Sequence, residues 1–172
     1  MPSWDPTTYL EFADERSRPF VDLLSRVNAA HPTVVVDLGC GPGQLTASLA
    51  DRWPDAQILG LDSSPEMITR AAEFAGPRVS FQVQDLRDWR PETRVDVIIS
   101  NATLQWVPRH RDLLPFLVST LSPDGWFAFQ VPGNFAEPSH QLLRQLAADP
   151  RYAPLLIEVA WPDAADAASL SG

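Results

Sequence analysis

The sequence contains no lysine and only one cysteine among its 172 residues. The single cysteine, Cys40, excludes a disulfide framework and a zinc site built from several cysteines. The absence of lysine excludes a phosphate-binding P-loop, in which a lysine follows the last glycine. No apolar run approaches the roughly 18 residues of a membrane-spanning helix. The first residues also lack the basic and apolar segments of a secretory signal.

Positive charge is scarce, because 13 arginines stand against 22 acidic residues and give a formal net charge of −9. A negative chain argues against a broad nucleic-acid or membrane surface, since phosphate groups bind to a positive field. Apolar residues nevertheless make up 45% of the chain, which is enough for one packed domain. We therefore expect a soluble, cytoplasmic domain whose partner is a small molecule.

Apolar runs and helical patterns alternate along the chain without an internal repeat. Five short runs are typical of strands that are covered on both faces, namely 33–39, 57–62, 79–85, 95–100 and 126–131. Apolar residues with helical spacing, or helix-start residues, predict helices at 20–27, 44–52, 64–75, 113–121 and 142–146. Strands separated by helices predict an α/β fold with a Rossmann-like, doubly wound parallel sheet. We place an N-terminal helical cap segment at 1–30, the core at 31–150 and a C-terminal segment at 151–172.

The glycine-rich segment Asp37-Leu-Gly-Cys-Gly-Pro-Gly43 joins the first predicted strand to the next helix. Glycine at positions 39, 41 and 43 lets the backbone turn tightly and approach a ligand at a helix N-terminus. Asp62 ends the next strand, 62 − 43 = 19 residues after Gly43, where a carboxylate can accept hydrogen bonds from ribose hydroxyls. Ligands of open parallel sheets bind at the carboxyl ends of the strands. The segment therefore predicts a site for a nucleotide-like ligand.

The spacing of this loop distinguishes between classes of ligand. A dinucleotide fingerprint requires glycine at the sixth position counted from Gly39, where this sequence has Gln44. An acid at position 37 would repel a pyrophosphate, but it suits the cationic amino group of a methionine-like ligand. The pattern favours an adenosyl amino acid over NAD.

The same loop, taken with Asp62, Asp85 and Ser100-Asn-Ala102, resembles the class I S-adenosylmethionine-dependent methyltransferases. Five short segments are more narrowly similar to trans-aconitate 2-methyltransferases, and the similarity extends from about Trp4 to about Tyr152. They are Trp4-Asp-Pro-x-x-Tyr-x-x-Phe12, Leu61-Asp-Ser-Ser-Pro-Glu-Met67, Asp85-Leu-Arg-Asp-Trp89, Asn101-Ala-x-Leu-x-Trp-Val-Pro108 and Pro132-Gly-Asn-Phe-x-x-Pro-Ser-His140.

The resemblance implies S-adenosylmethionine as the cofactor and assigns roles to individual residues. Those implied at the cofactor are Gly39, Gly41, Gly43 and Asp37 at the methionine part, Asp62, Ser63 and Met67 at the adenosine, Asp85 and Leu86 at the adenine, and Asn101 beneath the sulfonium. The resemblance also implies that Tyr9 and Arg16 cover the cofactor or the substrate. From their places after the fourth and fifth strands, Trp106 could form an aromatic wall over the substrate and His140 could contact it. Core packing of Trp106 and a surface position of His140 are equally open. The residues themselves leave other roles open: the aspartates could cap helices or stabilise loops, whereas Met67 and Cys40 could simply pack in the core.

The implied reaction is O-methylation of a carboxylate on a small polycarboxylic acid such as trans-aconitate. A carboxylate is ionised at neutral pH and needs no general base, so no catalytic residue and no metal site are assigned. The alternatives are methylation of a carrier-bound malonyl group or another small metabolite, and a non-catalytic cofactor-binding fragment. The resemblance also implies two further strands, and none is predicted after Tyr152. We therefore expect segment 126–131 to form an exposed edge strand that is prone to self-association.

Overall fold

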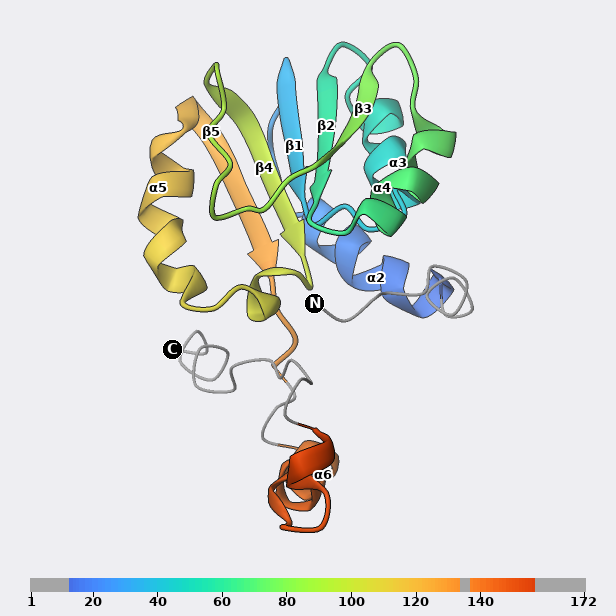
Figure 1. Ribbon diagram of the computed structural model, residues 1–172. Coiled ribbons are helices and arrows are strands. Elements are labelled where there is room, and N and C mark those ends of the chain that lie inside the picture. The colour runs from blue at the N-terminus through green and yellow to red at the C-terminus, as the bar shows by residue number, and fades with distance from the viewer. Residues whose placement is uncertain (1–12, 134–136, 157–172) are drawn as a thin grey trace.

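Five parallel strands form one sheet in the computed structural model, which describes residues 13–133 and 137–156 (Figure 1). Their order across the sheet is β3-β2-β1-β4-β5, and every neighbouring pair is parallel. The strands are β1 (Val34–Leu38), β2 (Gln57–Asp62), β3 (Val79–Val83), β4 (Val95–Asn101) and β5 (Leu121–Gln130). Their carboxyl ends meet at a single edge of the sheet, toward which the arrowheads in Figure 1 point. The predicted α/β fold is confirmed.

Helices connect the strands largely where they were predicted. The α-helices are α2 (Ala13–Leu24), α3 (Gln44–Arg52), α4 (Pro65–Ala71), α5 (Leu114–Ser119) and α6 (Pro138–Ala148), with short 3-10 turns η1 (Ala72–Phe74), η2 (Leu104–Trp106), η3 (His110–Leu113) and η5 (Ala153–Leu155). Ser64 caps α4 as expected, because its hydroxyl accepts a hydrogen bond from the Met67 N–H at 3.2 Å. The helix that was predicted to continue to residue 75 is α-helical only to Ala71, and the next three residues form the 3-10 turn η1.

Strand β5 begins five residues earlier than predicted, and Leu121 lies in this strand and not in the preceding helix. Leu121 pairs with Val95, and the next pair is Trp126 with Val97, so β5 bulges between the two pairs. Asp124 adopts a φ of 63° within the bulge. A Pro-Asp-Gly sequence is typical of a turn, which explains why the sequence predicted only the second half of the strand.

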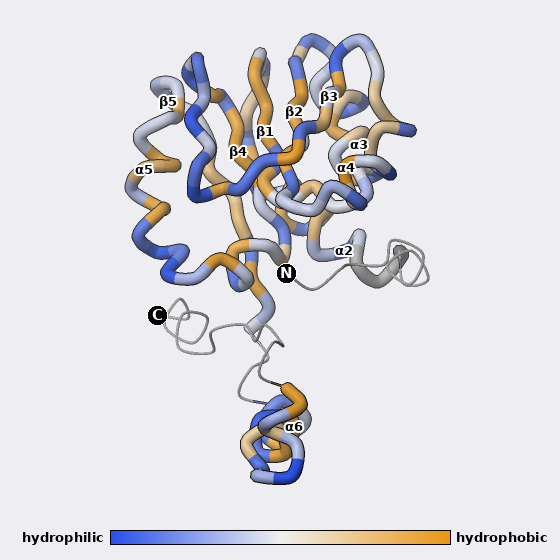
Figure 2. Tube along the Cα trace, in the orientation of Figure 1, coloured by the Kyte–Doolittle hydropathy of each residue, from blue (hydrophilic) through white to orange (hydrophobic). Residues whose placement is uncertain are grey.

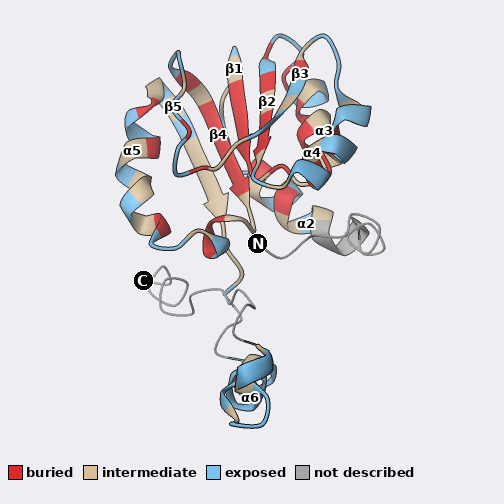
Figure 3. Cartoon of the chain, viewed as in Figure 1, coloured by how far each residue is buried: buried red, intermediate tan, exposed pale blue. Residues whose placement is uncertain are grey.

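Two apolar clusters cover the two faces of the sheet. On one face, Phe20 and Leu24 of α2 and Leu49 and Trp53 of α3 pack against side chains of β1, β2 and β4. On the other face, Leu117 of α5 packs with residues of the connections that follow β3 and β4. Figure 3 shows that β1 and β4 are buried for most of their length, and Figure 2 shows that the strands carry the apolar residues. Helix α2 thus contributes to the core, whereas the predicted division at residue 30 stays a prediction.

Asp96 ties together the amino ends of the central strands, where the chain enters β1. Its Oδ2 accepts hydrogen bonds from the Thr33 N–H at 2.7 Å, the Thr33 hydroxyl at 2.8 Å and the Val34 N–H at 3.1 Å. Burial alone would raise the pKa of Asp96, but these bonds and one from the Ser122 hydroxyl lower it to about 2. Asp96 therefore stabilises the fold through its ionised form.

The end of the described chain contributes little to the core. Helix α6 buries none of its residues, and Figure 1 shows it apart from the sheet. Strand β5 lies at an edge of the described sheet, as predicted for segment 126–131, and its self-association stays a prediction. Within the described ranges, no helix has the length and apolar character needed to span a membrane.

Candidate functional site

The glycine loop between β1 and α3 lies at the carboxyl edge of the sheet and is held to the end of β2. The N–H groups of Gly39 and Cys40 both donate to the carbonyl of Leu61, at 2.7 and 2.9 Å. All three glycines of the loop have positive φ angles, 82° at Gly39, 54° at Gly41 and 88° at Gly43. Residues other than glycine rarely adopt such φ angles. The backbone path of the loop therefore requires glycine at positions 39, 41 and 43.

Two of these glycines also make room for other parts of the protein. A Cβ atom added to Gly39 would lie 2.0 Å from Oγ1 of Thr103, which follows β4. A Cβ atom added to Gly43 would lie 2.7 Å from the Cβ of Ala71 on α4. The sequence predicted that the missing side chains let a ligand approach. In the structure, the space beside Gly39 and Gly43 is filled by Thr103 and Ala71.

Helix α3 begins directly after the loop and presents its N-terminus at the same edge. Gly43 occupies the N-cap position without a side-chain cap. The first N–H groups of a helix lack partners within the helix and carry a partial positive charge, which favours an anionic group. At 9 residues, α3 is long enough to present such an end. The loop and the helix together can therefore receive a carboxylate.

Asp37 lies beneath the loop and is 3% exposed. Its Oδ2 accepts a hydrogen bond of 2.6 Å from the hydroxyl of Thr46 on α3, whereas no described residue donates to its Oδ1. Burial raises the pKa of Asp37 to about 6, against the lowering effect of Thr46 and with a smaller contribution from the Asp62 carboxylate. A buried carboxylate with one unengaged oxygen is suited to a cationic ligand group.

Asp62 closes the loop from the end of β2. Its Oδ2 accepts from the Gly41 N–H at 3.0 Å and its Oδ1 accepts from the Ser64 N–H at 2.9 Å. Burial raises the pKa of Asp62, and the backbone N–H groups around it oppose that rise. Each carboxylate oxygen has two acceptor positions. The Gly41, Ser63 and Ser64 N–H groups all act on the carboxylate, so Asp62 stabilises the loop and keeps one acceptor position for a ligand hydroxyl.

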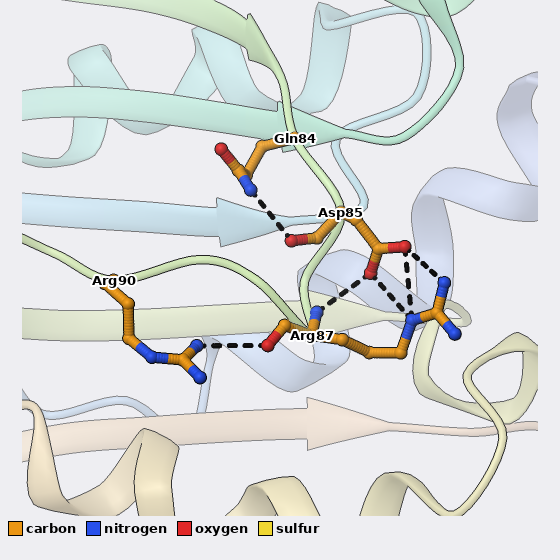
Figure 4. Close-up of polar contacts among 4 residues, drawn as sticks. All are labelled: Gln84, Asp85, Arg87 and Arg90. Carbon is orange, nitrogen blue, oxygen red and sulfur yellow. Dashed lines mark hydrogen bonds and ion pairs between the residues drawn. The ribbon is translucent and has the colours of Figure 1, made fainter.

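Asp85 follows β3 and forms a bidentate ion pair with Arg87 (Figure 4). Its Oδ1 accepts from the N–H and Nε of Arg87, and its Oδ2 accepts from Nε at 3.1 Å and Nη2 at 2.5 Å. The hydrogen bonds from Arg87 lower the pKa of Asp85. Four contacts use the acceptor positions of both oxygens. An adenine amino group would therefore compete with Arg87 for this carboxylate, which the sequence did not predict.

A tight turn after β4 completes this edge of the sheet. Ala102 has a φ of 52°, which is unusual for a residue other than glycine and marks a strained turn. The Gln105 side chain donates to the Ala102 carbonyl at 2.6 Å and supports the turn. Asn101, immediately before it, accepts from the Gln130 side chain of β5 at 2.7 Å. The turn places Thr103 against the glycine loop.

The other predicted site residues are more widely spread. Met67 and Leu86 are buried, whereas Ser63 is exposed beside Asp62. Trp106 is 42% exposed in η2, and His140 lies on α6, apart from the sheet. Tyr9 lies outside the described residues, and of Arg16 only the backbone, within α2, is described.

Cys40 lies inside the loop and is 8% exposed. Burial and the charges of Asp37 and Asp62 raise the pKa of its thiol, so the thiolate that acts as a nucleophile is disfavoured. Among the residues that the structure describes, no group of His, Cys, Asp and Glu could hold a metal ion. The arrangement thus provides hydrogen-bond acceptors and backbone donors for a ligand.

Comparison with known proteins agrees with this geometry. A family model described as "Methyltransferase domain" matches residues 35–125, from β1 to the bulge of β5. The chain belongs to this methyltransferase domain family. The match contains the glycine loop, Asp62, Asp85 and the turn after β4. The carboxyl end of β5 lies just beyond it.

Individual relatives of this methyltransferase domain carry more specific names than the family does. The chain is 54% identical over 159 residues to a trans-aconitate 2-methyltransferase of Streptomyces avermitilis, covering 88% of this chain and 59% of that protein. It is also 54% identical over 156 residues to the Rhodococcus jostii protein of the same name, covering 91% of this chain and 60% of the relative. The chain thus spans about three fifths of the length of these relatives.

A solved structure shows the same fold. An S-adenosylmethionine-dependent methyltransferase from Mesorhizobium loti superposes with a TM-score of 0.58 at 27% identity, over 65% of this chain and 52% of that one. The parallel sheet and its flanking helices are therefore those of class I methyltransferases.

Proposed function

We propose that the chain forms the cofactor-binding part of an S-adenosylmethionine-dependent methyltransferase that esterifies a carboxylate of trans-aconitate. The observation that carries this proposal is the identity of 54% to trans-aconitate 2-methyltransferases over most of the chain. The glycine loop, Asp62 and Asp85 supply groups of the kinds that an adenosyl amino acid needs.

The described residues fit this cofactor in their chemistry. Asp37 is buried with an unengaged Oδ1, which suits the amino group of the methionine part. The uncapped N-terminus of α3 suits its carboxylate. Asp62 would accept from the ribose hydroxyls, with Ser63 beside it. Asp85 would accept from the adenine amino group in competition with Arg87. Met67 and Leu86 would line the apolar floor beneath, and Asn101 would close the site at the end of β4.

The chemistry of the reaction requires alignment more than proton transfer. Bound S-adenosylmethionine supplies a sulfonium methyl group whose S–C bond breaks as a carboxylate O–C bond forms, giving a methyl ester and S-adenosylhomocysteine. A carboxylate acceptor carries no proton at neutral pH, so no residue has to remove one. The protein's contribution is to hold the donor and exclude misaligned acceptors. Trp106, exposed beside the end of β4, would provide an aromatic wall for the acceptor, and the predicted roles of Tyr9, Arg16 and His140 belong to the same proposal.

Calorimetric titration with S-adenosylhomocysteine and with NAD tests the cofactor directly. We expect S-adenosylhomocysteine to bind and NAD not to bind. Asp62→Asn removes a charged acceptor and should weaken S-adenosylhomocysteine binding about tenfold or more, since a hydrogen bond to a charged group contributes about 1.5–3 kcal/mol. The matched variant Asp55→Asn changes the same group in an exposed turn and should bind normally. Binding of NAD alone would overturn the proposal.

The acceptor is tested by methyl transfer to trans-aconitate, citrate and a malonyl-carrier protein. We expect trans-aconitate to be the best acceptor and its product to be a methyl ester. Preference for the malonyl-carrier protein would replace the proposed acceptor and leave the cofactor standing. Binding of S-adenosylhomocysteine without transfer to any of the three would identify the chain as a cofactor-binding fragment.

A further inference from the structure

Thr46 is a polar residue in an otherwise apolar position. It lies in the first turn of α3, on the side of the helix that faces the sheet, and is 0% exposed. Leu49, one turn later, is also fully buried and belongs to the apolar cluster on that face. A buried hydroxyl must find a partner, because leaving it without one is costly. Its partner therefore shows what the hydroxyl does.

That partner is the Asp37 carboxylate, at 2.6 Å. A carboxylate only accepts, so the hydroxyl is the donor. The bond joins the end of β1 to the start of α3 across the glycine loop, and it fixes Oδ2 of Asp37 against the helix. Since no described residue donates to Oδ1, that oxygen is the one left to face a ligand.

The surroundings of Asp37 make this hydrogen bond important for its charge. In the described part of the chain, the titratable groups near Asp37 are Asp62 at the end of β2 and the Cys40 thiol in the loop. Burial and Asp62 both disfavour the ionised carboxylate, and Thr46 is the side chain that favours it. The hydroxyl is therefore placed to control both the orientation and the charge of Asp37.

We propose that Thr46 is a positioning residue for cofactor binding, which acts by holding Asp37 ionised with Oδ1 directed to the ligand's cationic amino group. This inference rests on the proposed function and assigns a role to a residue outside the loop motif. A positioning role and a packing role predict different effects of valine at position 46. Valine has nearly the shape of threonine and would fill the same space, but it lacks the hydroxyl that donates to Asp37.

Three variants at position 46 separate the two roles. Thr46→Val keeps the shape and removes the hydroxyl, Thr46→Ser keeps the hydroxyl, and Thr46→Cys keeps a weak donor should the valine variant fold poorly. Thr69→Val is the control, because its hydroxyl donates to the Pro65 carbonyl on the exposed side of α4. Circular dichroism and amide NMR spectra establish that each variant is folded.

The first measurement is an NMR titration of the Asp37 carboxyl carbon without ligand. Thr46→Val should raise the pKa of Asp37 by about 1–2 pH units, the size expected for one hydrogen bond to a charged group. Thr46→Cys should give a smaller rise, and Thr46→Ser and Thr69→Val should leave the pKa unchanged. An unchanged pKa in Thr46→Val would overturn the inference whether or not the protein binds a cofactor.

The second measurement is the affinity for S-adenosylhomocysteine between pH 5 and pH 9. At pH 7, Thr46→Val should weaken binding about two- to tenfold, because a rise of 1–2 pH units from about 6 lowers the ionised fraction of Asp37 by that factor. Affinity should recover at higher pH as Asp37 ionises, and Thr46→Ser should follow the native profile. A pH-independent loss in Thr46→Ser, with native affinity in Thr46→Val, would show a packing role and overturn the inference. If the native chain bound no S-adenosylhomocysteine at any pH, the proposed function would fail, and the NMR titration would still decide whether Thr46 controls Asp37.

Discussion

Asp96→Asn should reduce the stability of the fold at neutral pH and have little effect in acid. Asparagine keeps an oxygen that can accept from Thr33 and Val34, so the geometry at the amino end of β1 is largely retained. The variant loses the negative charge that hydrogen bonds from Thr33, Val34 and Ser122 now stabilise. The perturbation therefore isolates the contribution of the charge.

The magnitude follows from the pKa of Asp96, which falls from an ordinary 3.8 to about 2. At about 1.36 kcal/mol per pH unit, this fall corresponds to roughly 2.4 kcal/mol. Because Asp96 is only partly buried, solvent screening reduces this value, and we expect about 1 kcal/mol. A pKa that is lower in the folded state stabilises the protein above pH 4, and this stabilisation is lost as the pH falls toward 2.

Urea unfolding of the native protein and of Asp96→Asn, measured at pH 7 and at pH 3, tests this reasoning. The difference in unfolding free energy should be about 1 kcal/mol at pH 7 and clearly smaller at pH 3. Asp55→Asn, which removes a carboxylate from an exposed turn, should show no such difference. If Asp96→Asn were equally destabilising at both pH values, the charge of Asp96 would not be the cause.

Four further predictions concern Arg87, Ser64, Cys40 and Gly39. Arg87→Ala should tighten S-adenosylhomocysteine binding about 1.5- to 5-fold, the range of an exposed ion pair, because it releases Asp85. Calorimetry should show no such gain for the control Arg70→Ala. Weaker binding in Arg87→Ala would refute the competition between Arg87 and the adenine amino group. Ser64→Ala should cost about 1 kcal/mol in urea unfolding through loss of the α4 cap, whereas Ser64→Asp should retain most of the stability. Ellman's reagent should modify Cys40 about 100-fold more slowly in the native protein than in urea, because the buried thiol reacts only when the structure opens locally. Rapid modification of the native protein would contradict the burial of this thiol. Gly39→Ala should destabilise the protein by more than about 1 kcal/mol, from the positive φ and the contact with Thr103 together, and Thr103→Gly should restore part of that loss in a double-variant cycle.

The sheet could be predicted because its signal is local. The runs that form β1, β2 and β4 are apolar almost throughout, as strands covered on both faces must be, and Ser64-Pro65 has the features of a helix start. The beginning of β5 could not be predicted in this way. Its Pro-Asp-Gly segment has local turn chemistry, and only pairing with Val95 and Val97 makes it part of a strand.

The candidate site was predictable in the residues that we propose to face the ligand but not in their supports. Asp37, Asp62 and the glycines follow strands in a recognisable order, so their common edge follows from the topology. Thr46 carries one local signal, a hydroxyl on the apolar side of a helix, which could have identified it. Thr103 carries no such signal, since the contact with Gly39 joins residues 64 positions apart.

This contact between Thr103 and Gly39 joins two parts of the chain that are synthesised at different times. Thr103 follows Gly39 by 64 residues, so β2 and β3 are made between them. A chain emerging from the ribosome therefore contains the whole loop motif before it contains the side chain that packs against Gly39. The complete carboxyl edge exists only once β1 and β4 have become neighbours.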